Sequence, residues 1–548
     1  MCIAAIAVIA VLIPVLLIAW LYSTANLQKP IGLEPTNRQL TIISDSLRAC
    51  GTDTLHLSRD GWWEIKLGGQ AFERGESFGK LTQDILYQQE KSFIDQIREF
   101  VPSDRYLNFL KYLTLTFNHS LGKYINEEYR NEIYGVSLSC SPDFNFVCEP
   151  YERQMNYHSA HDVGHVMQDY MLVGCSSFAA WGSCSADGNL VVGRNFDFYM
   201  GDDFARNRIL MFCKPDSGYS FASVSWPCMI GVMSGMNEKG LTVSINAAKS
   251  AMPTSSATPI SILCREILQY ASTIDEAYQI ASNRRTFVSE SILIGSMADS
   301  CAVVIEKSPE QIALRRTDSL YIISTNHYLS DVFSHDERNL ENIATSDSPL
   351  RYKRISELMH NKFPIGVDDA AAILRDYKGV GGIDIGLTNE LAINQFIGHH
   401  SVIFCPTRML MWVSTSPWQA GPYIAYNLAD IFSGKTSFAR GAADYSLTIP
   451  DDPLITANNI DNLLIFKQIT HKLRTMLKQN IPADSALISQ YISLNPELYA
   501  AHELAGDLYS ISGNIPKAAA EWQTALEKVI PKAAERTRIE NKLAATAQ

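Results

Sequence analysis

The chain has 548 residues, of which 46% are hydrophobic and 19% are charged, and its formal net charge is −12 at pH 7. This composition is typical of a folded globular protein and excludes a disordered or fibrous chain. Because the charge balance is acidic and no basic stretch interrupts it, the sequence argues against DNA or RNA as a partner.

The N-terminus, residues 1–25, carries no charged side chain and holds a run of twenty apolar residues broken only by Pro14. About 20 such residues cross the hydrocarbon core of a bilayer, and Trp20 and Tyr22 stand where interfacial aromatic residues occur. The pattern predicts a transmembrane anchor. A cleaved signal peptide is the alternative, because Ser23–Ala25 offers a small-residue cleavage site. Both predict a membrane-anchored or exported protein with its catalytic domain on the non-cytoplasmic side.

The next two segments differ in character. Residues 26–56 are polar and contain two prolines and two glycines, which predicts a linker. Residues 57–135 are predicted to be mostly helical. Within them, Ala71–Arg98 and Tyr106–Tyr134 carry apolar residues at three- and four-residue spacing with charges between them.

From Cys175 the sequence changes to short β-branched and aromatic runs separated by turn residues. Strands are predicted at 190–192, 241–245, 291–305, 319–324 and 400–414, and helices near 260–283 and 350–376. Strands that alternate with pairs of helices predict a layered α+β domain.

The C-terminal segment, residues 455–548, consists almost entirely of helix formers. Its small and aromatic residues have the offsets of a tetratricopeptide helix pair: Gly506, Tyr509, Gly513, Ala518, Trp522 and Ala525. An ordinary helical hairpin is the alternative. A single repeat cannot bury its own apolar face, so this tail is expected to pack on the main domain or on a protein partner.

The eleven cysteines are scattered without a C-x-x-C pair, and a zinc ribbon or a thioredoxin-type site is unsupported. Cys140 and Cys148 either pair or remain buried thiols. His161 and His165 have the spacing of a zinc helix, but Asp162 is shorter than the usual Glu base and Gly164 weakens a helix, so a capping or packing role is preferred. No G-x-S-x-G elbow, Walker A motif or dinucleotide fingerprint is present, and we predict no cofactor and no metal.

Two stretches carry the chemistry: VGCSSFAAW at 173–181 and GRNFDF at 193–198. They resemble the N-terminal-nucleophile (Ntn) hydrolases of the acyl-CoA:6-aminopenicillanic acid acyltransferase (peptidase C45) family, with choloylglycine hydrolases and acid ceramidase as more distant relatives. Further landmarks over about 60–425 agree in order and rough spacing: Gly69, Gly75, Gly79, Glu132–Gly135, Gly235–Leu241, Asn246, Thr325–His327, Ser348–Arg351, Arg354 and His400–Val402.

The resemblance implies a four-layer αββα Ntn-hydrolase sandwich that cuts its own chain between Gly174 and Cys175. Residues 57–174 would form the upstream segment of this domain and residues 175–430 the catalytic segment. It also implies acyl transfer through a Cys175 thioester. The substrate would be a small N-acyl compound with an apolar acyl group, and an anchor would suit a lipid substrate.

Residue chemistry agrees with that implication. Attack of the Cys175 thiol on the Gly174 carbonyl would release the Cys175 amine, and glycine tolerates the backbone strain that this step needs. A free α-amine has a pKa of about 7.7–8 and can act as the general base. Cys184 is a competing thiol, but Ser183 precedes it rather than glycine.

The remaining roles come from matched positions. Arg194 would lower the pKa of the thiol, and Asp197 would orient the new ammonium group. Asn246 would donate to the oxyanion, where losing one donor typically slows catalysis about 100- to 1,000-fold. Asn326 would be a second polar member and Arg351 a second cation, and His327 has no predicted role.

Three alternatives remain open at this point. One is a phospholipase B-like lipid ester hydrolase of the same superfamily. A second is a membrane-tethered, non-catalytic interaction protein that uses its helical tail, which the presence of Cys175, Arg194, Asp197 and Asn246 argues against. The weakest is a metalloenzyme that uses His161 and His165.

Overall fold

The computed structural model describes residues 12–17, 19–20, 27–101, 103–160, 162, 174–227, 229–250, 256–456 and 459–546. Most of the predicted N-terminal anchor and both histidines of the zinc-like pattern, His161 and His165, lie outside these residues. In the part that the structure describes, we find no helix with the length and apolarity needed to span a bilayer.

The first sheet is antiparallel except where β4 pairs in parallel with β7. Eleven strands of the described chain form it, in the order β1 (Leu40–Ser44), β2 (Leu47–Cys50), β3 (Asp53–Leu57), β4 (Trp63–Gly69), β7 (Ile209–Pro215), β8 (Phe221–Ser225), β9 (Ser234–Asn237), β10 (Leu241–Ala247), β11 (Glu290–Ser296), β12 (Cys301–Lys307) and β13 (Ile312–Arg315). The segment predicted as a linker, 26–56, therefore supplies edge strands to this sheet instead.

The second sheet is antiparallel and begins one residue after Cys175. Within the described chain its order is β14 (Tyr321–Ser324), β5 (Ser176–Ala180), β6 (Val191–Phe196), β15 (His400–Cys405), β16 (Leu410–Ser414), β17 (Tyr423–Asn427) and β18 (Asp444–Ile449). Since β18 belongs to it, this domain continues past the predicted boundary at 430.

The two sheets pack face to face, and successive side chains along each strand point alternately into the core between the sheets and toward the outer helices. In β5, Ala179 points into the core between the sheets, and Phe178 and Ala180 point to the opposite side. In β11, Leu293 joins the same inter-sheet core while its neighbours face the helices on the outside of the first sheet. The layers therefore run helices, sheet, sheet, helices.

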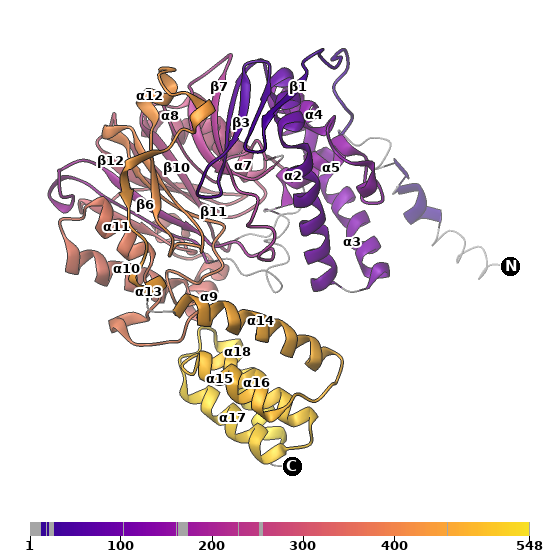
Figure 1. Ribbon diagram of the computed structural model, residues 1–548, viewed down its shortest axis with the longest axis vertical. Coiled ribbons are helices and arrows are strands. Elements are labelled where there is room, and N and C mark those ends of the chain that lie inside the picture. The colour runs from indigo at the N-terminus through magenta and orange to yellow at the C-terminus, as the bar shows by residue number, and fades with distance from the viewer. Residues whose placement is uncertain are drawn as a thin grey trace.

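Helices cover both outer faces (Figure 1). The first sheet carries α2 (Ala71–Phe100), α3 (Asp104–Phe117), α4 (Glu127–Ser137), α5 (Pro150–His158), α7 (Ile260–Tyr270) and α8 (Ile274–Asn283). The second carries α10 (Ser348–Lys362) and α11 (Val367–Leu374), with α9 (Glu337–Thr345) beside α10 and α12 (Leu428–Phe432) after β17. The helix predicted over Tyr106–Tyr134 is divided into α3 and α4 by a 3₁₀ turn at Asn118–Lys123.

The glycine landmarks have a packing reason. An ideal Cβ on Gly75 of α2 would lie 1.9 Å from the carbonyl oxygen of Glu132, and one on Gly135 of α4 would lie 2.3 Å from that of Phe72. The two helices therefore touch backbone to backbone. The buried Glu132 carboxylate at this contact accepts from Arg74 (2.6 Å) and pairs with Arg265 of α7 (3.3 Å), which satisfies its charge.

The C-terminal tail packs on the main domain and continues the chain below the layers (Figure 1). Its helices are α13 (Pro453–Thr456), α14 (Asn459–Lys478), α15 (Ser485–Leu494), α16 (Tyr499–Ile511), α17 (Ile515–Glu527) and α18 (Ala533–Ala545). α16 and α17 meet where Gly506 lies against the Trp522 ring, since an ideal Cβ on Gly506 would come within 2.5 Å of it. The helix pair is confirmed, and its kinship to tetratricopeptide repeats stays a prediction.

Candidate active site

The Gly174–Cys175 peptide lies at the start of β5, next to the end of β6. The two strands pair with Ser177 opposite Arg194, and every residue of both is buried. Beyond the paired residues, the Gly174 N–H donates to the backbone oxygen of Asp197 (3.1 Å), and the Cys175 thiol points at the same oxygen (3.9 Å). The register of one strand pair thus brings Cys175, Arg194 and Asp197 together.

Arg194 is a buried cation whose hydrogen-bond partners are neutral. Its guanidinium donates to the hydroxyl of Ser234, the carbonyl of Ile245 and Nε2 of His400 (3.1 Å), and Nη2 lies 4.0 Å from the Cys175 sulfur. Burial lowers the pKa of Arg194. A thiolate on Cys175 would provide a negative charge at contact distance, so this arrangement favours ionisation of the thiol.

Arg351 holds the backbone on both sides of the predicted cleavage point. Its Nη1 donates to the carbonyl oxygens of Gly174 (3.0 Å) and Cys175 (2.7 Å) and to the Ser176 hydroxyl (3.1 Å). Arg351 is itself oriented by Asp347, which accepts from Nε (2.9 Å) at the start of α10. The second cation of the site therefore acts on the backbone of the nucleophile segment.

Burial dominates the ionisation of the two reactive groups. It raises the pKa of the Cys175 thiol to about 11, although Arg194 acts in the opposite direction. It also raises the pKa of Asp197 to about 7, against the attraction of Arg351 and Arg194. Neither carboxylate oxygen of Asp197 accepts a well-formed hydrogen bond from the described residues. In the uncut chain the thiol is therefore protonated at neutral pH and Asp197 is poised to exchange a proton.

The two predicted asparagines flank the site, and their amide groups are already engaged. Asn246 uses Nδ2 to donate to the Ser177 hydroxyl (2.7 Å) and the Ser324 carbonyl (2.9 Å), while its buried Oδ1 has no partner in the described chain. Asn326 accepts from Nη2 of Arg351 (2.7 Å) through Oδ1. In the uncut chain Asn246 has no donor left for an oxyanion, so its predicted role stays a prediction.

His327 contacts the two segments that carry Asn326 and Arg351. Its Nδ1 lies 2.7 Å from the Ser348 hydroxyl, which also accepts from the backbone N–H of Asn326 (2.7 Å). Burial lowers the pKa of His327 to about 4, so the ring is neutral at pH 7. This geometry links the Asn326 turn to the first turn of α10, the helix that carries Arg351.

Sequence reasoning missed several neighbours of these groups. His400, noted only as a landmark, accepts from Arg194, and its Nδ1 lies 2.9 Å from Nδ1 of His399. A guanidinium can only donate, so Nε2 of His400 must be the acceptor. The proton of the neutral His400 ring is therefore on Nδ1, which donates it to Nδ1 of His399. Gln395 was not predicted at all. The Gln395 amide packs closely on Gly174, because an ideal Cβ added to Gly174 would lie 2.2 Å from Nε2 of Gln395.

The other candidate groups do not join this arrangement. Cys184 lies in a separate short turn, and both Cys140 and Cys148 are free thiols rather than a disulfide. Among the described residues, no group of three or more His, Cys, Asp or Glu side chains is arranged to hold a metal ion.

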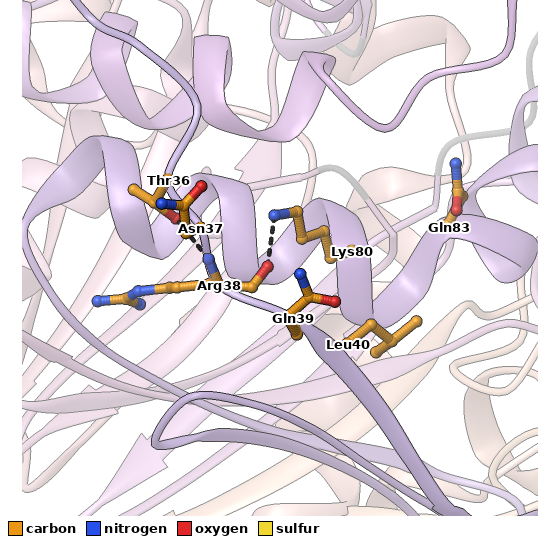
Figure 2. Close-up of a pocket in the computed structure, with 7 residues that line it drawn as sticks. All are labelled: Thr36, Asn37, Arg38, Gln39, Leu40, Lys80 and Gln83. Carbon is orange, nitrogen blue, oxygen red and sulfur yellow. Dashed lines mark hydrogen bonds between the residues drawn. The ribbon is translucent and has the colours of Figure 1, made fainter.

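A surface pocket of about 320 Å³ lies elsewhere, between α2 and the segment before β1 (Figure 2). Its two cations are already paired within the protein. Lys80 donates to the Arg38 carbonyl (2.7 Å) and to Glu76 (2.8 Å), and Arg38 pairs with Asp53 and Glu73. The pocket therefore offers no free positive charge to an anionic ligand.

Comparison with protein families gives a match in the middle of the chain. Residues 184–381 match the family described as acyl-coenzyme A:6-aminopenicillanic acid acyl-transferase. The match covers about a third of the chain and shows that this segment is similar to that family. The matched segment, 184–381, contains Arg194, Asp197, Asn246, Asn326 and Arg351 and begins after Gly174 and Cys175, which the described geometry joins to it.

Two curated relatives also match. One is an uncharacterized protein of Archaeoglobus fulgidus, 23% identical over 342 residues, covering 56% of this chain and 56% of the relative. The other is protein dcd1B of Dictyostelium discoideum, 21% identical over 267 residues, covering 45% and 51%. The chain thus spans about half the length of the curated relatives it matches.

Solved structures give weaker similarity. A Caenorhabditis elegans ortholog of N-acylethanolamine-hydrolyzing acid amidase is 15% identical, with 42% of this chain and 93% of that chain covered and a TM-score of 0.33. A conjugated bile acid hydrolase from Clostridium perfringens is 13% identical, with 44% and 89% covered and a TM-score of 0.28. At these scores no conclusion about this chain rests on them.

Proposed function

We propose that this chain is a self-processing Ntn hydrolase or acyltransferase in which Cys175 first cuts the chain and then attacks the substrate. One observation carries the proposal. The buried Arg351 guanidinium donates to the carbonyl oxygens of Gly174 and Cys175, beside a thiol that a second buried cation contacts. A carbonyl polarised in this way is the electrophile that self-cleavage requires.

The cleavage step uses no group from outside the chain except water. The Cys175 sulfur attacks the Gly174 carbonyl carbon as the thiol loses its proton, and the carbon–nitrogen bond then breaks. The Cys175 nitrogen takes up a proton and becomes a free α-amine, while Gly174 is held as a thioester. Water hydrolyses the thioester, which leaves a Gly174 carboxylate and a free thiol at the new N-terminus.

Two groups would serve as proton acceptors in turn. In the uncut chain, Asp197 is the candidate, because its pKa is raised to about 7 and its charge acts on the Cys175 thiol. After cleavage, the Cys175 amine, with a typical pKa of about 7.7–8, would take that role toward the substrate. Asp197 would then hold the ammonium form.

Oxyanion stabilisation would also differ between the two stages. In the uncut chain Arg351 is the donor on the Gly174 carbonyl, and Asn326 and Asp347 fix its orientation. Asn246 would become a donor to the substrate only after the nucleophile segment rearranges, since both of its N–H groups are engaged beforehand.

The proposed substrate is a small N-acyl compound with an apolar acyl group, cleaved at its amide or transferred to an amine. The description of the matched family names an acyl-transferase, and two aromatic side chains lie next to the site. Phe196 and Phe198 flank Asp197 in sequence and stack with their ring centroids 5.8 Å apart. We also propose, from residues 1–25, that the protein is anchored in or exported across a membrane.

The first experiment is the intact mass and N-terminal sequence of purified wild type, Cys175→Ala and a control, Cys184→Ala. We expect wild type and the control to give two fragments, one starting Cys-Ser-Ser-Phe, and Cys175→Ala to stay whole. An uncut wild type would contradict the proposal. The processed protein is then offered an N-acyl amine and an oxygen ester of the same acyl group. Preference for the ester would favour a lipid ester hydrolase instead.

A further inference from the structure

The loop at 385–396 lies between the cleavage point and the C-terminal tail. On its inner side, the Gln395 amide packs on Gly174, and Nε2 of Gln395 donates to the backbone oxygen of Glu390 (3.0 Å). The loop is also tied to β6, because Asn195 donates to the Ile393 carbonyl (2.9 Å). Any movement of this loop therefore reaches the scissile peptide directly.

The tail forms hydrogen bonds and an ion pair with the outer side of the same loop. The Asn495 amide, between α15 and α16, accepts from the Leu387 N–H (3.0 Å) and donates to the Leu387 carbonyl (2.8 Å). Asn389 donates to the Val529 carbonyl after α17 (3.1 Å), and Lys532 before α18 pairs with Glu390. These contacts hold the loop at Leu387, Asn389 and Glu390.

The ion pair of Lys532 also bears on Arg351. The Glu390 carboxylate faces Lys532, Glu535 and Tyr499 from the tail and Asp347 from the main domain. Asp347 is the residue that accepts from Nε of Arg351. Lys532 therefore supplies a positive charge next to a pair of carboxylates, one of which orients the cation on the cleavage point. Burial already raises the pKa of Glu390 to about 7, so without the Lys532 charge this carboxyl would take up a proton and the ion pair that ties the loop to the tail would be lost.

We propose that the C-terminal tail is a positioning element of the active site, and that Lys532 and Asn495 hold the 385–396 loop so that Gln395 and Arg351 keep their places on Gly174 and Cys175. This inference rests on the proposed function of the site. The described residues of the tail touch none of the reacting atoms and act through the loop. Because a misplacement of about 1 Å costs on the order of 100-fold in rate, loosening the grip should slow chemistry without removing it.

The test uses full-length protein with matched variants. Lys532→Gln removes the charge and Lys532→Arg retains it, while the control Lys528→Gln breaks the Lys528–Glu497 pair within the tail. Asn495→Asp keeps the side-chain oxygen that accepts from the Leu387 N–H and loses the N–H that donates to the Leu387 carbonyl. Its control, Asn514→Asp, keeps an oxygen that caps α17. Three quantities are measured: the self-cleavage rate, the kcat and KM of the processed form, and tail stability by thermal unfolding.

We expect Lys532→Gln and Asn495→Asp to slow self-cleavage and to lower kcat about tenfold, with KM little changed. The expected loss is smaller than the roughly 100-fold cost of a 1 Å misplacement, because the tail acts on the site only through the loop. Lys532→Arg should restore the rate, and both controls should match wild type. Equal slowing by the controls would overturn the inference, because it would mean a general effect of tail stability. Wild-type rates in Lys532→Gln and Asn495→Asp with a folded tail would also overturn it.

A second measurement does not depend on activity. In the uncut Cys175→Ala background, hydrogen exchange of the Gly174 amide, which donates to the Asp197 carbonyl, reports the order of the cleavage point. We expect faster exchange there with Lys532→Gln and no change with Lys528→Gln. If wild type fails to cut itself, the proposed function fails, and this exchange still decides whether the tail orders the site. Unchanged exchange would refute the positioning role.

Discussion

Replacing Arg351 tests whether a guanidinium on the scissile carbonyl drives self-cleavage. Arg351→Met removes three hydrogen bonds from one nitrogen: those to the carbonyls of Gly174 and Cys175 and to the Ser176 hydroxyl. The first of these carbonyls is where negative charge develops when the thiol attacks. The substitution keeps a long apolar side chain, so it removes charge and donors with little loss of volume.

The expected magnitude follows from these contacts. Loss of one oxyanion donor costs about 100- to 1,000-fold in rate, and Arg351 is the donor that reaches the Gly174 oxygen in the described chain. Arg194 remains beside the sulfur and continues to favour the thiolate. We therefore expect self-cleavage of Arg351→Met to be at least 100-fold slower than that of wild type, measured as the rate at which the two fragments appear on gels or by intact mass.

The control is Arg354→Met, one helical turn further along α10. Arg354 forms a two-bond ion pair with Asp376 (2.9 Å for each bond) and does not contact the cleavage point. It therefore reports the cost of losing a buried arginine from this helix. Cleavage of folded Arg351→Met at the wild-type rate, or equal slowing by Arg354→Met, would refute the role given to Arg351.

Three other changes follow from the same contacts. Gly174→Ala should slow self-cleavage by up to about tenfold, because its Cβ would lie 2.2 Å from Nε2 of Gln395 and the Gln395 amide would have to move off the scissile peptide. Asp197→Asn, in uncut Cys175→Ala protein, should raise stability against urea by up to about 4 kcal/mol at pH 8 and by less at pH 5. Burial raises the folded pKa of Asp197 from 3.8 to about 7, so the parent loses stability as pH rises from about 4 to 7. Gly75→Ala should cost about 1–3 kcal/mol or more, since its Cβ would lie 1.9 Å from the Glu132 carbonyl oxygen.

Each of these has an internal check. Adding Gln395→Ala to Gly174→Ala should restore part of the cleavage rate, and no recovery would mean that the clash is elsewhere. A stability gain of Asp197→Asn that is equal at pH 5 and pH 8 would contradict the pKa assignment. Gly68→Ala is the control for Gly75→Ala. Its Cβ would meet the Lys214 carbonyl oxygen at an ordinary 3.4 Å, so a similar loss there would exclude the helix contact as the cause.

The parts of the fold that were predicted are those with local signals. The helix expected over Ala71–Arg98 is α2, Ala71–Phe100, because its apolar spacing is continuous over many turns. The sequence predicts a linker where the structure has the strands β1 to β3. They have only four or five residues each, and β1 is exposed along its whole length, so no alternation of buried and exposed positions marks it.

The site divides in a similar way. Cys175, Arg194 and Asp197 could be predicted to meet, because two consecutive strands of one hairpin carry them. The partners of Arg194 could not, since Ser234 lies 40 residues away in sequence and His400 lies 206 residues away, in strands whose pairing no local pattern encodes. Gln395 had no signal either. Its contact with Gly174 is visible only once the loop before β15 is in place.

The uncut chain restrains its own nucleophile, and that restraint explains why cleavage would come before substrate chemistry. Cys175 is buried with a pKa raised to about 11, and its nitrogen is tied up in a peptide bond, so it can supply no base. Both donors of Asn246 are engaged by Ser177 and Ser324. Arg351 is the donor already in position, and it points at the chain's own carbonyl. In the described site a donor therefore already reaches the Gly174 carbonyl, while the donors of Asn246 are still engaged, and this difference supports the proposal that the chain is its own first substrate.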